Sequence, residues 1–222
     1  MLVNDSKSVP YYESTEWISS LDYIGPKETL SISYAQSNVT SDSIAHNTED
    51  FKIITHETNK NLGGFLITAI NECNTDYICF LDSDCTYSPK LVNQMLDKIE
   101  EGYEIVNASP WHPDGEVIGL SKFREFISKS ANFIYRLILR KKIYTSSSIC
   151  KIYKFDCIKD IKITNDGFVA VTELFSKALL KNNKFFEFPC LLTVRQYGSS
   201  KINITNTFFE HIKYMIKLFY IK

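Results

Sequence analysis

The stretch YICFLDSDCTYSP, residues 77–89, constrains the fold more than any other part of the sequence. Its first five residues form a continuous apolar run between polar flanks, which is typical of a strand buried on both faces. Asp82 and Asp84 follow directly at the carboxyl end of that run. In open α/β sheets, ligands bind in the crevice outside the carboxyl ends of the strands. The pattern therefore predicts an α/β fold with paired carboxylates at its ligand-binding edge.

The two carboxylates favour a site for a divalent cation. Asp82 and Asp84 carry like charges, which repel each other unless a positive group lies between them. Mg²⁺ or Mn²⁺ would take one or two such carboxylates together with substrate phosphates, and would neutralise the charge that develops on a diphosphate leaving group. Asp-Ser-Asp also fits a solvated turn, because its residues are turn formers. The apolar strand before the triplet and the helical pattern after it favour the metal site.

Length and composition exclude several classes of protein. We expect the 222 residues to form one domain, 1–222. The 25 basic and 26 acidic residues give a net charge of -1 and no general attraction to nucleic acid. Six cysteines without zinc-site spacing indicate reduced thiols in a cytoplasmic protein. Because we find neither a signal pattern nor an apolar run of about 18 residues, we expect any membrane contact to be peripheral.

Short apolar runs alternate with longer amphipathic ones, which predicts a sheet with helices packed on its faces. Strands are predicted at residues 30–34, 51–55, 77–81, 104–108 and 185–189. Helices are predicted at residues 15–24, 62–71, 89–100, 121–140, 169–180 and 207–218. Ser88 as N-cap and Pro89 at the first helical position mark the start of the third helix.

Residues 120–142 form an amphipathic and basic segment, in which Phe123, Ile127, Ile134 and Ile138 recur near helical spacing. Its basic residues are Lys122, Arg124, Lys129, Arg136, Arg140, Lys141 and Lys142. Such a helix can lie on an anionic membrane, where each nearby Lys or Arg contributes about 1 kcal/mol. An ordinary surface helix with one face in the core gives the same pattern. Residues 208–222 have the same two interpretations.

Two pairs of residues are suited to bind phosphate. In VRQYGSSK, residues 194–201, Arg195 can bind phosphate oxygens bidentately and Lys201 supplies a point charge, with a flexible turn at Gly198 between them. The same segment also fits a solvated turn. Arg124 and Ser128 lie four residues apart on the predicted helix, and therefore on one face, where they can bind a second phosphate.

Glu173 is an isolated charge within the apolar helix of VTELFSKALL, residues 171–180. A buried charge is costly unless it faces a cavity or a partner, so Glu173 is a candidate for orienting a sugar hydroxyl or an active-site loop. The alternative is a solvent-facing glutamate paired with Lys177 at i to i+4.

Taken together and in this order, these motifs resemble glycosyltransferase family 2, most of all its branch of dolichol-phosphate mannose synthases and bacterial polyprenyl-phosphate glycosyltransferases. The resemblance covers most of the chain and is strongest from His56 onward, in HETNKNLGG, DYICFLDSDCTYSP, NASPWHPDG, the RxxxS of Arg124 and Ser128, GFVAVTELFSKAL and EFPCLLTVRQYGSSK. It implies a GT-A fold, which is a Rossmann-like nucleotide-sugar fold with a mostly parallel central sheet flanked by helices.

The resemblance also implies roles for single residues. Asp82 and Asp84 would form the DxD motif, with Asp84 the preferred direct metal ligand, and the RxxxS pair would face an acceptor phosphate. Arg195 and Lys201 would contact the donor diphosphate. Members of this branch usually invert the anomeric centre, and a phosphate acceptor hardly needs a general base. Stabilising the departing diphosphate is then expected to carry most of the catalysis, and the candidate catalytic residues are Asp84, Arg195 and Glu173.

The N-terminal part of the domain, up to about residue 50, is divergent from the family pattern. Where the family has Pro-x-Tyr-Asn-Glu, this chain reads VPYYEST, which keeps Pro10 and Tyr12 as donor-binding candidates and lacks the Asn. The family's Asp-Asp-Gly-Ser-Thr-Asp appears as SNVTSD, without the carboxylate that holds the nucleotide base. Hydrogen bonds from Ser37 or Asn38 would have to substitute for it.

These observations predict a metal-dependent glycosyltransferase that moves a sugar from a nucleotide-diphosphate donor to a polyprenyl phosphate, working peripherally at the cytosolic face of a membrane or with a membrane partner protein. One alternative is transfer to a saccharide or glycolipid hydroxyl in cell-surface polysaccharide assembly, with Glu173 or another carboxylate as base. A second alternative is a catalytically degenerate protein that binds a nucleotide sugar or a partner without turnover.

Overall fold

The computed structural model describes residues 30–35, 54, 56, 58–82, 86–88, 90–181, 183–194 and 204–221. Its strands are β1 (Leu30–Ala35), β2 (Tyr77–Asp82), β3 (Ile105–Ser109), β4 (Glu116–Ile118), β5 (Lys151–Lys154), β6 (Phe185–Pro189) and β7 (Leu191–Thr193). Its helices are α2 (Asn61–Glu72), α3 (Lys90–Glu100), α4 (Lys122–Leu139), α5 (Phe155–Ile158), α6 (Val169–Leu180) and α7 (Ile204–Ile221).

Five of these strands form the central sheet, in the order β1-β2-β5-β3-β6. β1, β2, β3 and β6 run in one direction, and β5 runs against them between β2 and β3. The register places Lys151 of β5 beside Phe80 of β2 and Asn107 of β3. The mostly parallel sheet is confirmed, with one antiparallel strand that the sequence did not predict. A smaller sheet pairs β4 with β7 in parallel.

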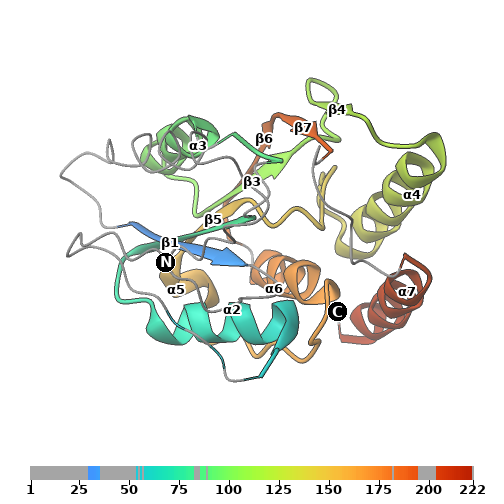
Figure 1. Cartoon of the computed structure of the whole chain (residues 1–222). Helices are drawn as coiled ribbons and strands as arrows, with labels where there is room; N and C mark the ends of the chain where they lie inside the picture. Colours follow the sequence, from blue (N-terminus) through green and yellow to red (C-terminus); the bar gives the residue numbers. More distant parts are fainter. Residues whose placement is uncertain are drawn as a thin grey trace.

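Residues of the central sheet alternate between two apolar layers. On β2, Ile78 and Phe80 belong to the layer that contains α2 and α6, whereas Cys79 and Leu81 belong to the layer that contains α3. Figure 1 shows α3 on one side of the sheet and α2, α5 and α6 on the other. Because helices cover both faces, a strand in the middle can be apolar at every position, as the run before Asp82 predicts.

α3 illustrates how the sequence fixes the ends and the buried side of a helix. The helix ends at Glu100 and is followed by Gly102, whose φ of +87° is a left-handed conformation that glycine adopts without a steric penalty. The Gly102 N–H donates to the Ile99 carbonyl at 2.8 Å, and the Tyr103 N–H donates to the Lys98 carbonyl at 3.2 Å. These two bonds close the helix as a Schellman motif. Its buried residues follow helical spacing: Leu91, Val92, Met95 and Ile99.

α4 and α7 pack against each other at the end of the molecule toward which the arrow of β1 points (Figure 1). Ser121 caps α4 because its hydroxyl oxygen accepts the Arg124 N–H at 3.5 Å. The buried side of α7 is formed by Tyr214, Met215 and Leu218. The buried side of α4 is formed by Asn132, Tyr135 and Leu139.

Every predicted helix that falls on described residues is present, with ends shifted by at most three residues. The predicted helix at 15–24 lies outside the described residues, and so does the predicted strand at 51–55 except for Ile54. β4, β5, β7 and α5 were not predicted, because three or four residues are too few to establish a period. Among the described residues, no helix has the length and apolarity that crossing a bilayer requires.

Candidate active site

The carboxyl ends of β1, β2, β3 and β6 meet at one edge of the central sheet. There the register pairs Ala35 with Asp82, and Ser109 with Pro189. β2 ends at Asp82, as the apolar run predicts, and Asp84 follows two residues further along the chain. The other candidates on the donor side lie outside the described residues, and their roles stay predictions: Asp84, Pro10, Tyr12, Ser37, Asn38, Arg195 and Lys201.

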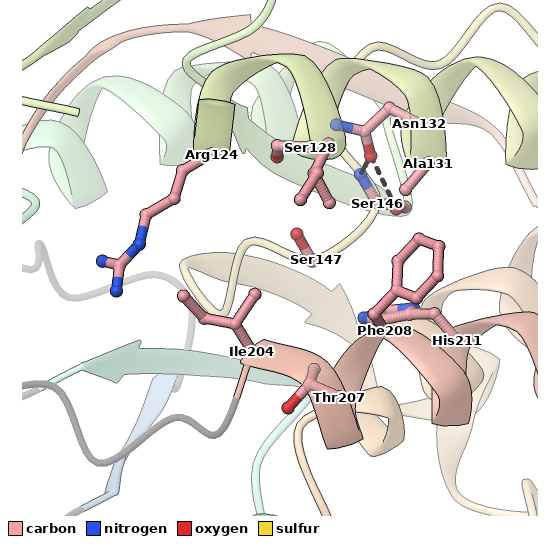
Figure 2. Close-up of a pocket in the computed structure, with 11 residues that line it drawn as sticks. Arg124, Ser128, Ala131, Asn132, Ser146, Ser147, Ile204, Thr207, Phe208 and His211 are labelled. Carbon is pink, nitrogen blue, oxygen red and sulfur yellow. Dashed lines mark hydrogen bonds between the residues drawn. The ribbon is translucent and has the colours of Figure 1, made fainter. Parts of the chain in front are cut away.

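A cavity of about 170 Å³ lies between α4, α7 and the loop of residues 144–148 that leads into β5. We call it the α4–α7 cavity, and Figure 2 shows its lining. The structure brings Arg124 and Ser128 together in its wall, as their spacing predicts. The complete lining is Arg124, Ile127, Ser128, Ala131, Asn132, Ser146, Ser147, Ile204, Thr207, Phe208 and His211.

α4 contributes a line of three hydrogen-bond donors to this cavity. Arg124, Ser128 and Asn132 are spaced at i, i+4 and i+8, which places them one above the other on one helix face. Their burial increases along the line, from the exposed Arg124 through the half-buried Ser128 to Asn132, which is 4% exposed. The cavity therefore has a cation near solvent and neutral donors deeper inside.

α7 forms the opposite wall and is held in place by two buried hydrogen bonds. The Tyr135 hydroxyl on α4 lies 2.8 Å from Nδ1 of His211, and the Ser176 hydroxyl on α6 lies 2.5 Å from the Tyr214 hydroxyl. Burial lowers the pKa of His211 to about 4, so the imidazole is neutral at pH 7. The only cation that lines the cavity, within the part of the chain that the structure describes, is then Arg124.

Residues 144–148 form the third wall, and the buried carboxylate of Glu187 on β6 fixes them through hydrogen bonds. Its two oxygens accept the backbone N–H groups of Tyr144 at 2.6 Å and Thr145 at 3.3 Å. They also accept Nδ2 of Asn107 at 2.8 Å and the hydroxyl of Ser109 at 2.9 Å. Burial raises the pKa of Glu187, and these four hydrogen bonds oppose that rise. Four donors on one carboxylate fix the path of the loop.

Lys151 holds the same loop through its carbonyl groups. The side chain is fully buried, its Nζ lies 4.9 Å from the ring centroid of Phe175, and Nζ donates to the carbonyl oxygens of Ser146 and Ser148. Burial lowers the pKa of Lys151 to about 7. Glu187 thus binds backbone N–H groups of this short loop, and Lys151 binds its backbone carbonyl groups. Together they place Ser146 and Ser147 in the cavity wall.

Glu173 lies on α6 and pairs with Lys177 at 2.6 Å, as one of the two sequence interpretations predicts. That interpretation was wrong in placing the side chain toward solvent, because the side chain is fully buried. Its oxygens also accept the backbone N–H and hydroxyl of Thr164 and the backbone N–H and Nδ2 of Asn165. Burial alone would raise the pKa of Glu173, but the bonds from Lys177, Asn165 and Thr164 lower it to about 2. The carboxylate organises residues 164–165, and its direct part in a reaction stays a prediction.

Sequence reasoning missed the residues that support the cavity, namely Asn107, Asn132, Lys151 and Glu187. Two of them could have been identified from the sequence. Lys151 and Glu187 are single charges inside the short apolar stretches ICKIY and FFEFP, where a charge requires a buried partner. Asn132 continues the four-residue spacing of Arg124 and Ser128. Nothing in the sequence indicates that Asn107 lies beside Glu187, 80 residues away.

The described residues contain no group of three His, Cys, Asp or Glu side chains that could hold a metal ion. The side chains of the candidate ligands Asp82 and Asp84 lie outside the described part of the chain, which includes only the backbone of Asp82. Carboxylate oxygens at the carboxyl edge of the sheet are the donors that Mg²⁺ and Mn²⁺ prefer. The donor chemistry of this pair therefore fits the predicted cation.

A mostly parallel α/β sheet with helices on both faces, in which β2 ends at an aspartate at the carboxyl edge, is the architecture of the GT-A glycosyltransferase fold. The sequence model described as Glycosyl transferase family 2 matches residues 36–162, which is more than half of the chain. The chain belongs to this family.

Two curated relatives are similar over much of the chain. It is 24% identical to a dolichol-phosphate mannosyltransferase of Pyrococcus furiosus over 169 residues, 75% of this chain and 47% of that protein. It is 24% identical to a polyprenol monophosphomannose synthase of Mycolicibacterium smegmatis over 129 residues, 57% of this chain and 49% of that protein. The chain spans about half the length of both relatives. These similarities support the branch that the motifs indicate.

Solved structures share the fold. A glucosyl-3-phosphoglycerate synthase from Mycobacterium tuberculosis with Mn²⁺, UDP and phosphoglyceric acid has a TM-score of 0.52 and 13% identity, covering 71% of this chain and 53% of that one. The same enzyme with Mg²⁺ and UDP has a TM-score of 0.51 and 14% identity, covering 71% and 54%. The GT-A fold predicted from the sequence is confirmed.

Proposed function

We propose that this chain is a glycosyltransferase that moves a sugar from a nucleotide-diphosphate donor to the phosphate group of a polyprenyl phosphate. The observation that carries the proposal is the α4–α7 cavity, in which Arg124 and Ser128 lie together with the hydroxyl groups of Ser147 and Thr207. A guanidinium and several hydroxyl donors suit the oxygens of a phosphate monoester. The relatives named for dolichol-phosphate and polyprenol chemistry support the same acceptor class.

The apolar part of the cavity suits the chain that such an acceptor carries. Ile127, Ala131, Ile204 and Phe208 line the space beside the donors. Phe208 is 44% exposed and connects the cavity to the outer surface of α7. A phosphate bound by Arg124 and Ser128 would therefore have an apolar exit for its polyprenyl group. A free sugar, which carries hydroxyl groups on every side, would make few favourable contacts with these apolar walls.

The transfer requires one bond to form and one to break. An oxygen of the acceptor phosphate attacks the anomeric carbon of the donor sugar, and the bond from that carbon to the diphosphate oxygen breaks, leaving its electron pair on the nucleotide diphosphate. The attacking oxygen is already an anion, so no strong base is needed. In this proposal Arg124 and Ser128 orient the acceptor, and Arg195 and Lys201 bind the diphosphate of the donor.

Asp82 and Asp84 would hold Mg²⁺ or Mn²⁺ on the donor side, at the edge of the sheet where β2 ends. A bound cation supplies positive charge that stabilises a diphosphate. Among the structures with the same fold, the glucosyl-3-phosphoglycerate synthase was solved with Mn²⁺ or Mg²⁺ together with UDP. Pro10, Tyr12, Ser37 and Asn38 complete the proposed donor site.

Glu173 fits a positioning role in this proposal better than the role of a base. Its oxygens are occupied by Lys177, Thr164 and Asn165, and its pKa of about 2 makes it a weak proton acceptor. Transfer to a sugar hydroxyl would require a base, so this geometry favours the phosphate acceptor over the saccharide acceptor. Thr164 also accepts a bond from Lys217 of α7 at 3.1 Å, which links Glu173 to the wall of the cavity.

α4 and α7 expose an unusual amount of apolar surface, which supports contact with a membrane. We call it the α4–α7 apolar surface; Phe126 and Phe219, 70% and 69% exposed, are among its largest members. Basic residues of 120–142 accompany it and would attract anionic lipids. A peripheral position on a membrane would bring the cavity to a lipid acceptor. The surface consists of Phe123, Phe126, Phe133, Ile134, Leu137, Phe208, Phe209, Ile216, Phe219, Tyr220 and Ile221.

The test is a transfer assay that follows a calorimetric titration. UDP, GDP and their common sugar conjugates are titrated with and without Mn²⁺ or Mg²⁺, and the conjugate that binds is then offered with farnesyl phosphate, farnesol or a saccharide. The proposal expects metal-dependent binding that is lost in Asp84→Ala, and product with farnesyl phosphate only. Product with the saccharide alone would support the alternative acceptor. Absence of any turnover would support the degenerate protein.

Variants on α4 test the acceptor side separately. Arg124→Ala should raise the KM for farnesyl phosphate about 10- to 100-fold, because a charge-assisted hydrogen bond contributes roughly 1.5–3 kcal/mol. Arg140→Ala removes an arginine that ends the same helix and does not line the cavity, so it should leave the KM unchanged. Equal effects of the two substitutions would contradict an acceptor site at Arg124.

A further inference from the structure

The side chain of Asn132 has an unusual hydrogen-bonding state. Its Oδ1 accepts the backbone N–H of Ser146 at 2.9 Å and the Ser146 hydroxyl at 2.7 Å. Its Nδ2 is buried and has no acceptor within the part of the chain that the structure describes. Leaving a buried donor without an acceptor is unfavourable. In a cavity wall, such a donor is available to an acceptor that binds there.

The orientation of this amide is fixed by chemistry. The backbone N–H of Ser146 can only donate, so the Asn132 atom that faces it must be the oxygen. Turning the amide over would set its NH₂ group against that N–H. The nitrogen therefore points away from Ser146, and Figure 2 shows it on the side of Asn132 nearer Ser128, with dashed lines for the two bonds to Ser146.

The partner of the amide, Ser146, is itself held in place. Lys151 donates to the carbonyl oxygens of Ser146 and Ser148, and Glu187 binds the two preceding N–H groups of the loop. A loop fixed from both sides leaves Ser146 little freedom to move toward Nδ2. The unpaired donor is thus built into the wall by Asn132, Ser146, Lys151 and Glu187 together.

We infer that Asn132 is a further binding residue of the α4–α7 cavity, whose side-chain NH₂ donates to an oxygen of a phosphate monoester. This inference rests on the proposed function and adds a residue to it. Arg124, Ser128 and Asn132 present a guanidinium, a hydroxyl and an amide along one helix face, and the neighbouring donors of Ser128 and Asn132, one turn apart, can reach one anionic group. The amide is the innermost of the three, so it recognises the phosphate at the buried end.

The experiment observes the Asn132 side-chain amide by ¹⁵N–¹H correlation spectroscopy of the complete chain. The two probes are inorganic phosphate and citronellyl phosphate, and citronellol is the uncharged control. The Asn132 signals are assigned by their absence in Asn132→Asp. We expect them to shift with citronellyl phosphate and not with citronellol. A shift with inorganic phosphate as well would show that the phosphate group is sufficient for binding. A shift with citronellyl phosphate alone would show that contacts between its apolar chain and the apolar walls are also required.

Asn132→Asp keeps an oxygen for Ser146 and replaces the donor by an acceptor, so the affinity for citronellyl phosphate should fall at least about 10-fold. Asn183→Asp is the matched control, because the Asn183 amide is also partly buried and hydrogen-bonded but lies away from the cavity. It should bind as the wild type does.

Two results overturn the inference in different ways. If citronellyl phosphate shifts the backbone signals of Arg124 and Ser128 while the Asn132 amide stays in place, or if Asn132→Asp binds it with unchanged affinity, the acceptor site stands and Asn132 has no part in it. If neither phosphate probe shifts any signal of the cavity wall, the proposed acceptor site itself is wrong. The titrations of the wild type distinguish these two results, and Asn132→Asp supplies the assignment of the amide signals and the comparison of affinity.

Discussion

The carboxylate of Glu187 on β6 accepts the backbone N–H of Tyr144 at 2.6 Å, although the two residues are 43 positions apart in the chain. This bond joins the central sheet to the loop that walls the α4–α7 cavity. The neighbouring bonds to Thr145, Asn107 and Ser109 use both oxygens of the same carboxylate. The shape of the cavity therefore depends on a residue that does not line it.

Removing this carboxylate should weaken both the fold and the acceptor site. Glu187→Ala removes the acceptor of the Tyr144 N–H and one of the two partners of Asn107 and of Ser109, which keep their bonds to Thr145. We expect a loss of roughly 3–5 kcal/mol in the free energy of unfolding. Glu187→Gln keeps one acceptor oxygen, should remain folded, and should raise the KM for the acceptor without changing the affinity for the donor. Urea denaturation and steady-state kinetics measure these effects. Glu101→Ala, which removes an exposed partner of Lys98, should change stability by no more than about 0.5 kcal/mol.

Substitution of Glu173 distinguishes a structural carboxylate from a catalytic base. Glu173→Gln replaces an acceptor oxygen by a donor next to Thr164, Asn165 and Lys177, and should cost roughly 2–4 kcal/mol while kcat changes little where the protein stays folded. A base would instead show a loss of kcat of about 100-fold or more with little change in stability. The control is Glu125→Gln, whose carboxylate makes the exposed pair with Lys129.

The pH dependence of stability is a second test of the structural role of the Glu173 carboxylate. Its pKa is about 2 in the folded protein and near 4.5 in an unfolded chain. The unfolded state therefore binds more protons between these values, and stability falls as the pH is lowered from about 4.5 toward 2. In Glu173→Gln this part of the fall should be absent. Urea midpoints at pH 5 and pH 3, compared between the two proteins, measure the difference.

Lys151 should make the protein more stable at mildly alkaline pH. Its pKa is about 7 in the folded state against 10.5 in an unfolded chain, so the unfolded state binds the extra proton between these values. The free energy of unfolding then rises with pH from about 7 to 9, by up to about 1.4 kcal/mol per pH unit. Lys151→Met should flatten this slope, and Lys154→Met on the same strand should keep it. A slope that is unchanged in Lys151→Met would mean that another group titrates.

The sequence predicts the parts of this fold that depend on local patterns. β2 and α6 are long apolar runs, and α3 has both a clear period and a glycine at its end, so each is recognised from neighbours in the chain. β5 was not predicted because it has only four residues and both of its ends are lysines, Lys151 and Lys154. Its strand character comes from pairing with β2 and β3. That pairing is a property of the whole sheet.

The candidate site also has a part that local patterns predict and a part that they do not. The spacing of Arg124 and Ser128 on one helix can be recognised from the sequence, and the structure places both residues in one wall of the cavity. The support from Asn107, Lys151 and Glu187 joins residues far apart in the chain, so no local pattern contains it. The buried state of Asn132 depends on the position of the Ser146 loop, which those same long-range bonds determine.

Membrane binding should depend on the α4–α7 apolar surface. Phe126 and Phe219 are exposed on α4 and α7, and their insertion at an interface would release apolar area from water. Replacing both by serine should weaken binding to vesicles that contain anionic lipid by about 2 kcal/mol, or roughly 30-fold. Ile67→Ser on α2 changes a residue that is 40% exposed and lies outside this surface, so it should have no effect. Sedimentation with vesicles measures the partition. Equal binding of the double variant and the wild type would show that this surface does not contact lipid, and weaker wild-type binding at high salt would show the part that basic residues contribute.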